Sequence, residues 1–285
     1  MKTPNREWPI IVGGCHRSGT SLVRRILNAH SRIHCGPEIK FFKDFYSDYV
    51  NDPIKHGRFI QSARSILPEE QLISILGKAF IELHEAAATQ AVKPRWADKN
   101  PENVLYLHQW DQLLGDEWYF VQVVRNPLDT LGSMVEANFK FAIPADLPGK
   151  IDFYNQYTQA GLNFYQTHPE RSYRIMYERL VASPWEQIEL LMQSLGEKAE
   201  QSQMDFNSAT HQVGLEDPKV KTTQKVHSDS IGRYKNDFSS QEIQEIQEKT
   251  STVWRKLDPE GFYIPEQNNI PEKKSFSFGH FFNKK

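Results

Sequence analysis

The sequence predicts an α/β fold of three layers, in which helices flank a central, mainly parallel sheet and a helical insertion is added. Short apolar runs typical of buried strands alternate along the chain with longer segments of helical periodicity. The chain has 285 residues, 39% of them hydrophobic, which is enough to bury one large core without cross-links. We therefore expect a single domain over residues 1–264, followed by a loosely ordered tail over residues 265–285.

The chain opens with a strand, a glycine-bearing turn and a helix. Residues 10–12 are apolar and β-branched, and Gly13 and Gly14 end this run, which favours a short buried strand. From residue 20, apolar side chains recur with helical spacing to about residue 30. A second short strand is expected over residues 32–35. This order places a loop between a buried strand and the first helix.

The rest of the chain continues the alternation of helices and strands. Residues 52 to about 92 keep a helical period and form the predicted insertion. Residues 118–124 are the strongest candidate strand, because they are rich in β-branched and aromatic side chains. The other expected elements are an extended segment at 95–98, a helix from 101 to 114, a helix from 127, a strand at 172–176, and helices at about 188–195 and 242–254.

Charge and cysteine content restrict the class of protein. Lys and Arg total 34 and Asp and Glu total 36, so the formal net charge is −2. A nucleic-acid partner is not expected, because neutralising a phosphate backbone needs an excess of cations. Cys15 and Cys35 form neither a disulfide framework nor a CxxC zinc pair. With no secretory signal and no long apolar span in the sequence, we expect a cytoplasmic protein without a membrane span.

The loop after the first strand has the spacing of a phosphate-binding loop (P-loop). Residues 14–21 read Gly-Cys-His-Arg-Ser-Gly-Thr-Ser, with glycines at the first and sixth positions. Glycines allow the backbone to turn its N–H groups inward, and the following helix adds partial positive charge at its N-terminus. The hydroxyls of Ser18, Thr20 and Ser21 add further donors. The loop is therefore predicted to bind an anion.

Two positions depart from the pattern of nucleoside triphosphatases. Thr20 stands where that pattern requires lysine, and the strand at 118–124 is followed by Arg125 instead of a magnesium-binding aspartate. A cation instead lies inside the loop, at Arg17. The sequence thus favours an anionic nucleotide over magnesium-dependent phosphoryl transfer. A kinase with an atypical loop and a non-catalytic nucleotide-binding protein remain as alternatives.

Several motifs together resemble those of sulfotransferases that use 3′-phosphoadenosine 5′-phosphosulfate (PAPS). Residues 17–22 resemble the family's 5′-phosphosulfate loop, and residues 125–129 followed by Ser133 resemble its 3′-phosphate motif. Residues 38–42, Glu-Ile-Lys-Phe-Phe, are similar to a segment of carbohydrate sulfotransferases. Further matches, in the family's order, are residues 98–101 and, more weakly, 177–181 and 230–233. The resemblance covers residues 10 to about 235 and implies one sulfotransferase domain.

The resemblance implies three catalytic residues. Glu38 would be the general base that accepts a proton from the acceptor hydroxyl, although a carboxylate after Pro37 could also cap a helix. Arg17 would stabilise charge on the phosphosulfate, and its permanent charge makes it a poor acid. Lys99 would be a second cation, with an ordinary surface lysine as the alternative. The role of Lys40, at a position where relatives often carry histidine, is left open.

The resemblance also implies how the cofactor is held, with no metal required. Arg125 and Ser133 would bind the 3′-phosphate, since arginine offers paired donors to phosphate. The full set of expected PAPS contacts is His16 (through its backbone), Arg17, Ser18, Gly19, Thr20, Ser21, Arg125, Ser133, Tyr177 and Arg233.

The acceptor is less well defined by the sequence. The segment at 38–42 favours a carbohydrate or another small hydroxyl-bearing metabolite, while tyrosine in peptides is a second possibility. Four aromatic residues could line an acceptor pocket, although aromatic residues are more often part of a core. They are Trp96, Phe139, Phe141 and Tyr154.

Overall fold

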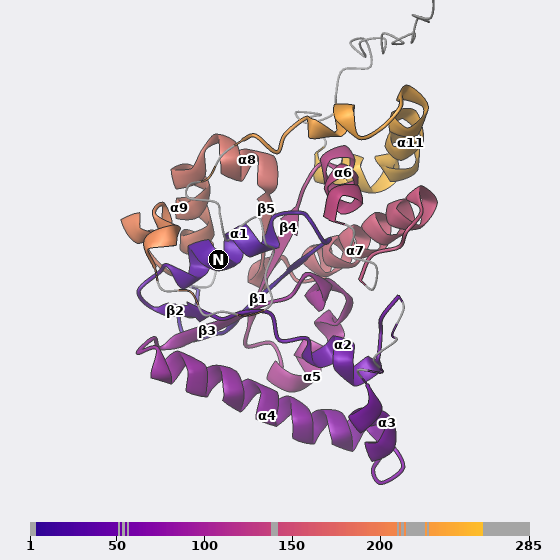
Figure 1. The fold of residues 1–285 in the computed structure, drawn as a ribbon. Coiled ribbons are helices and arrows are strands. Elements are labelled where there is room, and N and C mark those ends of the chain that lie inside the picture. Colours follow the sequence, from indigo (N-terminus) through magenta and orange to yellow (C-terminus); the bar gives the residue numbers. More distant parts are fainter. Residues whose placement is uncertain are drawn as a thin grey trace, which may run out of the picture.

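The computed structural model describes residues 4–50, 52, 55, 57–137, 142–209, 211, 214, 226 and 228–258. Its centre is a sheet of five parallel strands in the order β2-β3-β1-β4-β5, which confirms the predicted parallel sheet (Figure 1). The strands are β1 Ile10–Gly14, β2 Ile33–Cys35, β3 Arg95–Lys99, β4 Tyr119–Val124 and β5 Ser172–Met176. The predicted tail at 265–285 lies outside the described residues.

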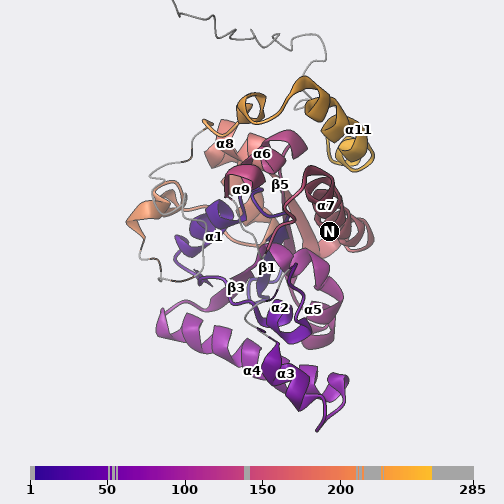
Figure 2. The same cartoon turned by 45° about the vertical axis from the view of Figure 1, so that its right-hand side comes forward.

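Helices cover both faces of the sheet and give the three predicted layers (Figures 1 and 2). The α-helices are α1 Thr20–Asn28, α2 Phe41–Tyr46, α3 Arg58–Ala63, α4 Glu69–Gln90, α5 Leu107–Leu114, α6 Pro127–Ala137, α7 Leu147–Thr167, α8 Tyr177–Ala182, α9 Pro184–Ser194 and α11 Ser240–Leu257. The short 3-10 helices are η1 Pro101–Leu105, η2 Pro169–Arg171, η3 Gln201–Gln203, η4 Phe206–Ser208 and η5 Arg233–Asn236.

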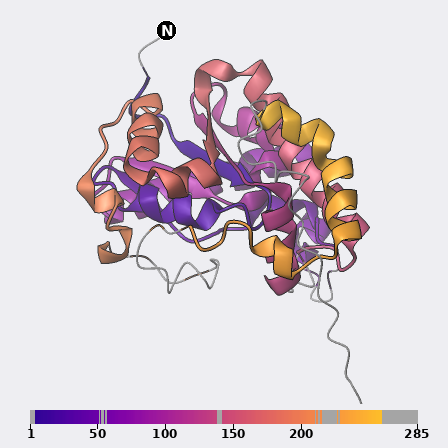
Figure 3. The ribbon, with the colours of Figure 1, turned by 90° about the horizontal axis from the view of Figure 1, so that it is seen from above.

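Alternating side chains of the central strand separate two cores. Ile10 and Val12 pack with buried residues of α1, α8 and α9 on one face. Ile11 points to the other face and packs in a larger core with residues of α4, α5 and α7. Successive residues of a strand point to opposite faces, so one apolar run such as Ile10–Val12 can serve both cores. On the second face, α11 packs beside α7 and α6 (Figure 3).

The helical segment predicted at 52–92 forms part of the crossover between β2 and β3. Its longest helix, α4, lies against both strands and buries Leu72, Ile73 and Phe80 (Figure 1). Neighbouring parallel strands need such a long connection, because each must start at the same end of the sheet. The segment therefore forms part of the outer layer of the fold.

The predicted helix at 101–114 is divided in the structure. Residues 101–105 form the 3-10 helix η1, and α5 starts only after Tyr106, whose φ of −120° lies outside the helical region. The Asn103 side chain explains the tight turn, because its amide donates to the Val12 carbonyl oxygen (3.0 Å) and to Oδ2 of Asp98 (2.8 Å). These bonds fix η1 against the end of β1.

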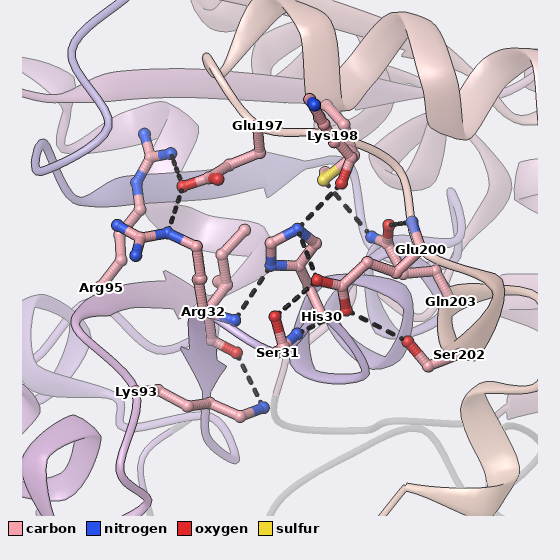
Figure 4. A network of polar contacts seen from close by, with 12 residues as sticks. His30, Ser31, Arg32, Lys93, Arg95, Glu197, Lys198, Glu200, Ser202 and Gln203 are labelled. Atoms are coloured by element: carbon pink, nitrogen blue, oxygen red, sulfur yellow. Dashed lines mark hydrogen bonds and ion pairs between the residues drawn. The ribbon is translucent and has the colours of Figure 1, made fainter.

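A polar network lies at the amino ends of β2 and β3 (Figure 4). The carboxylate of Glu197 contacts Arg6, Arg32 and Arg95 at 2.8, 3.3 and 3.6 Å, and its side chain is completely buried. Beside it, Glu200 accepts hydrogen bonds from the backbone and hydroxyl of Ser31 (Figure 4). The network thereby joins the segment after α9 to the strands β2 and β3. Among the helices of the described residues, we find none with the length and apolar character needed to cross a membrane.

Candidate active site

The predicted site residues meet at the carboxyl ends of the strands. The glycine loop follows β1, Lys99 ends β3, Arg125 follows β4 and Tyr177 follows β5. Because all the strands are parallel, these positions share one edge of the sheet, which is where α/β folds bind ligands.

The glycine loop is held in its bent shape from within. Arg17 and Gly19 have positive φ angles of 70° and 99°. The hydroxyl of Ser18 donates to the carbonyl oxygens of Cys15 (2.6 Å) and Val123 (3.1 Å), and its backbone N–H also donates to Cys15 (3.1 Å). Both donors of Ser18 are thus engaged inside the protein. In this geometry Ser18 shapes the loop, and a hydrogen bond from its hydroxyl to an anion would require these bonds to break.

The first turn of α1 presents its N-terminal end to the same edge. Gly19 precedes the helix, the first turn holds no acidic residue, and Thr20 and Ser21 are buried there. The unpaired N–H groups and the dipole at such an end favour an anion. The ring of Tyr177 packs over Gly19, where an added Cβ would lie 2.5 Å from the ring.

Arg17, Arg125 and Ser133 come together, although they are far apart in the sequence. Nε of Arg17 donates to Oγ of Ser133 at 3.1 Å, and Nη1 of Arg125 donates to the carbonyl oxygen of Arg17 at 3.0 Å. The Arg125 guanidinium also lies over the ring of Tyr177, 4.7 Å from its centroid, and donates to the carbonyl oxygen of Ser230 at 2.5 Å. One cluster therefore unites residues from four of the predicted motifs.

One donor of this cluster has no acceptor within the described part of the chain. Arg125 is only 6% exposed, and its Nε is buried without a hydrogen-bond partner there. A buried guanidinium donor left unpaired is costly, so the position is suited to an anion that would accept from it. Tyr154, proposed from sequence as a pocket residue, is fully buried and donates from its hydroxyl to the Arg125 carbonyl oxygen at 2.9 Å. This hydrogen bond holds the backbone of Arg125 in place.

Glu38 and Lys99 form an ion pair beside the loop. Nζ of Lys99 contacts Oε1 of Glu38 and also donates to Oγ of Ser21 at 3.1 Å. Lys99 is 1% exposed, so the alternative of an ordinary surface lysine is excluded. Nζ of Lys40 lies 2.5 Å from Oε2 of the same carboxylate. The proposed base is thus linked through Lys99 to the first turn of α1.

A second carboxylate, which the sequence analysis did not identify, stands behind this pair. Glu102 in η1 accepts from Nζ of Lys40 at 3.0 and 3.2 Å. Nζ of Lys43 and Nε2 of His16 lie 3.3 and 3.2 Å from Oε1 of Glu102. Glu102 directly follows the motif at 98–101, which was its only signal in the sequence. Its contacts to residues about 60 and 86 positions away depend on the tertiary fold.

The charges around these groups set their pKa values. Burial acts to raise the pKa of Glu38, but Lys99 and Lys40 outweigh it, and the pKa lies below its ordinary value. Burial opposes ionisation of Glu102 as well, yet the nearby ammonium of Lys40, with that of Lys43, holds the pKa of Glu102 well below the usual range. For His16, burial dominates and lowers the pKa. Both carboxylates are therefore ionised at neutral pH, and His16 is neutral.

The remaining predicted residues lie at the margin of the cluster or in the core. Arg233 forms an exposed ion pair with Glu136 at 2.9 Å. Glu136 is not part of the Arg125 cluster, so this ion pair does not link Arg233 to that cluster. Its loop is anchored nearby, since the N–H of Gly232 donates to Asp129 at 2.9 Å. Trp96 is buried and stacks on His84, as expected of a core residue. Phe139 and Phe141 lie outside the described residues.

Comparison with known proteins decides the class. The sequence profile of the sulfotransferase family matches residues 9–201, about two thirds of the chain. The chain belongs to the sulfotransferase family. This sulfotransferase is therefore a transferase enzyme, and family membership replaces the kinase and the non-catalytic alternatives.

Relatives and solved structures agree with the family. A Caenorhabditis briggsae protein with the provisional name protein-tyrosine sulfotransferase is 26% identical over 235 residues, covering 79% of this chain and 78% of that protein. The sulfotransferase domain of the Synechococcus PCC 7002 olefin synthase superposes with a TM-score of 0.61 at 15% identity, covering 90% and 97% of the two chains. The sulfotransferase domain of the curacin biosynthetic pathway gives a TM-score of 0.58 at 18% identity, covering 86% and 97%. At these identities the two structures show a shared fold.

Proposed function

We propose that this sulfotransferase transfers a sulfuryl group from PAPS to a hydroxyl of a carbohydrate or other small metabolite, with Glu38 as the general base. The observation that carries the proposal is the contact chain Glu38–Lys99–Ser21. It joins the candidate base directly to the first turn of the helix that follows the anion loop. A base and an anion site in this relationship suit transfer from an anionic donor to a hydroxyl.

The residues around the loop fit the two anionic ends of PAPS. Arg17, Lys99 and the N-terminus of α1 would hold the 5′-phosphosulfate, and Arg125 with Ser133 would hold the 3′-phosphate. The unpaired Nε of Arg125 supports this placement, because a phosphate oxygen would satisfy it. When bound, PAPS supplies an activated sulfuryl group on a phosphate leaving group.

Glu38 would accept the acceptor's hydroxyl proton at a carboxylate oxygen. Because Lys99 and Lys40 lower its pKa, Glu38 is ionised and ready to accept at neutral pH. Lys99 and the permanent charge of Arg17 would stabilise negative charge that develops on the leaving phosphate. No protein group is needed as a covalent nucleophile in this scheme.

The acceptor class rests on the segment that carries the base. Residues 38–42 resemble carbohydrate sulfotransferases, whereas the C. briggsae relative bears a name that refers to protein tyrosine. A tyrosine-containing peptide is therefore the second acceptor to test.

Two measurements test the proposal. Calorimetry with 3′-phosphoadenosine 5′-phosphate (PAP) should show binding, which Arg125→Ala with Ser133→Ala should weaken by at least roughly 100-fold. As a matched control, Arg255→Ala with Ser251→Ala on α11 should leave it unchanged. Absence of binding to the wild type, or equal binding by both double variants, contradicts the cofactor assignment.

Transfer of labelled sulfate from PAPS into a metabolite extract and into a tyrosine peptide then identifies the acceptor by mass. Glu38→Gln should keep PAP affinity and lose about 100- to 10,000-fold in turnover. Full turnover of Glu38→Gln would rule out Glu38 as the base.

A further inference from the structure

Glu102 is the point at which three separate elements meet beside the proposed base. It belongs to η1, while Lys40 precedes α2, Lys43 lies within α2 and His16 lies in the anion loop. Its side chain is only 4% exposed. The carboxylate therefore connects the loop after β1 with the segment that carries Glu38.

Lys40 is shared between two carboxylates. Its ammonium lies 2.5 Å from Oε2 of Glu38 and 3.0 Å from Oε2 of Glu102. An ammonium that belonged to Glu38 alone would join Lys99 in stabilising the charged form of Glu38, and would make it a weaker base. Sharing the ammonium with Glu102 limits this effect.

The charges around Glu38 and Lys40 support this sharing of Lys40 between the two carboxylates. Glu38 faces Lys99 from β3, Lys40 from its own segment and Glu102 from η1; of these, Glu102 acts to raise the pKa of Glu38. Lys40 has a raised pKa, because both carboxylates outweigh the effect of its burial, so it stays charged. The other titratable groups that act on or respond to Glu102 include His16, Lys43, Tyr49, Tyr106 and Tyr157.

We propose that Glu102 is a positioning residue for sulfuryl transfer: it holds Lys40 between two carboxylates, and so keeps Glu38 able to accept a proton. Glu102 acts through Lys40 and does not touch the reactants. Nε2 of His16 lies 3.2 Å from Oε1 of Glu102, which places the carboxylate beside the anion loop. The inference rests on the proposed function in one respect, namely that Glu38 is the base.

The primary test follows the titration of Glu38 and needs no acceptor. Infrared spectra of protein labelled with ¹³C in its glutamate carboxyl groups give the titration midpoint, assigned by the band that Glu38→Gln removes. Lys40→Met should raise the midpoint and Glu102→Gln should lower it, each by about one pH unit. In the Lys40→Met background only the direct repulsion between the two carboxylates remains, so Glu102→Gln should have a clearly smaller effect. An equal shift with and without Lys40, or no shift in Glu102→Gln, overturns the inference.

Folding defects are handled by the choice of variants. Glu102→Asp keeps the charge and should keep the wild-type midpoint to within about half a pH unit. If Glu102→Gln does not fold, the comparison of Lys40→Met with Lys40→Met/Glu102→Gln decides alone, because this pair removes both partners. A fall of well under about one pH unit in the double variant supports the inference, and a fall of about one pH unit overturns it.

Calorimetry with PAP on the same proteins separates the two proposals. A wild type that does not bind PAP overturns the proposed cofactor, while the Glu38 midpoints still test the sharing of Lys40. Where PAP binds, Glu102→Gln should keep its affinity and lose roughly 10- to 100-fold in turnover with the acceptor that labelled transfer identifies. Equal turnover with shifted midpoints would overturn the positioning role alone.

Discussion

Nε of Arg17 donates a hydrogen bond to Oγ of Ser133, 116 positions further along the chain, at a distance of 3.1 Å. The bond joins the anion loop after β1 to the second turn of α6, the helix that follows Arg125. The two sequence motifs that resemble separate phosphate sites are thus in direct contact. A substitution in either motif should therefore alter anion binding at the other motif.

Ser133→Ala tests this contact. The variant removes an acceptor from a charged donor, so we expect PAP to bind about 10-fold more weakly, with little loss of stability. Calorimetry gives the affinity and thermal melting the stability. Ser251→Ala, at a half-buried position of α11, is the control. Unchanged affinity in Ser133→Ala would show that the contact does not support binding.

Gly19→Ala should damage the loop more than a positive φ angle alone explains. Gly19 has φ of 99° and ψ of 14°, and Gly232 has φ of 75° and ψ of 8°, so alanine at either left-handed position costs about 1–2 kcal/mol in backbone strain. The added Cβ meets the Tyr177 ring at Gly19, whereas space is open around Gly232. Denaturant unfolding should therefore show a larger loss for Gly19→Ala, and PAP binding should fall more in that variant. Equal losses would contradict the packing of Tyr177 on the loop.

Glu178 should make stability depend on pH. Burial raises the pKa of Glu178 to about 7, despite the N–H of Asn126, which donates to it at 2.8 Å. The folded state therefore holds a proton that the unfolded state, with a pKa near 4.5, releases. This contribution is complete below about pH 4.5 and is lost as the pH rises to 7, by an amount of the order of 3 kcal/mol.

Comparison of the wild type with Glu178→Gln isolates this effect. The stability of the wild type relative to the variant should fall between pH 4.5 and 7 and stay constant above it. Glu189→Gln, at an exposed position of α9, should show no such trend. A flat difference for Glu178→Gln would place its pKa near the ordinary value.

Glu197→Ala should destabilise the fold without affecting PAP affinity per folded molecule. The variant leaves the fully buried Arg95 guanidinium without its carboxylate, which costs about 3–5 kcal/mol. The control is Glu69→Ala, which breaks the exposed pair with Arg64 and should cost less than about 1 kcal/mol. Denaturant unfolding measures both, and similar small losses would show that the network in Figure 4 contributes little to stability.

Much of the fold follows from local sequence signals. The strand at 118–124 is recognisable because β-branched and aromatic residues dominate it. The anion loop is recognisable because its glycines stand between a strand and a helix. The division of residues 101–114 was missed, since it depends on the Asn103 side chain reaching β1.

The site was predictable in its residues but less so in their connections. The motifs identified Glu38, Lys99 and Arg125, yet spacing along the chain could not show that Lys99 contacts Glu38. The sequence predicts Ser18 to be a donor to an anion, because one of the carbonyl oxygens that it contacts, that of Val123, becomes its neighbour only when β4 pairs with β1. Glu102 carried no pattern of its own, since its partners come from the loop and from α2.

The position of β1 in the middle of the sheet also has a consequence for biosynthesis. Its two partner strands are β3 and β4, which start 85 and 109 residues after Ile10. β1 therefore leaves the ribosome before either partner, and it is paired on both edges only after residue 124 has emerged. Until then, the nascent chain must keep the apolar run at residues 10–12 from aggregating. The anion loop takes its folded shape only after β4 has paired with β1.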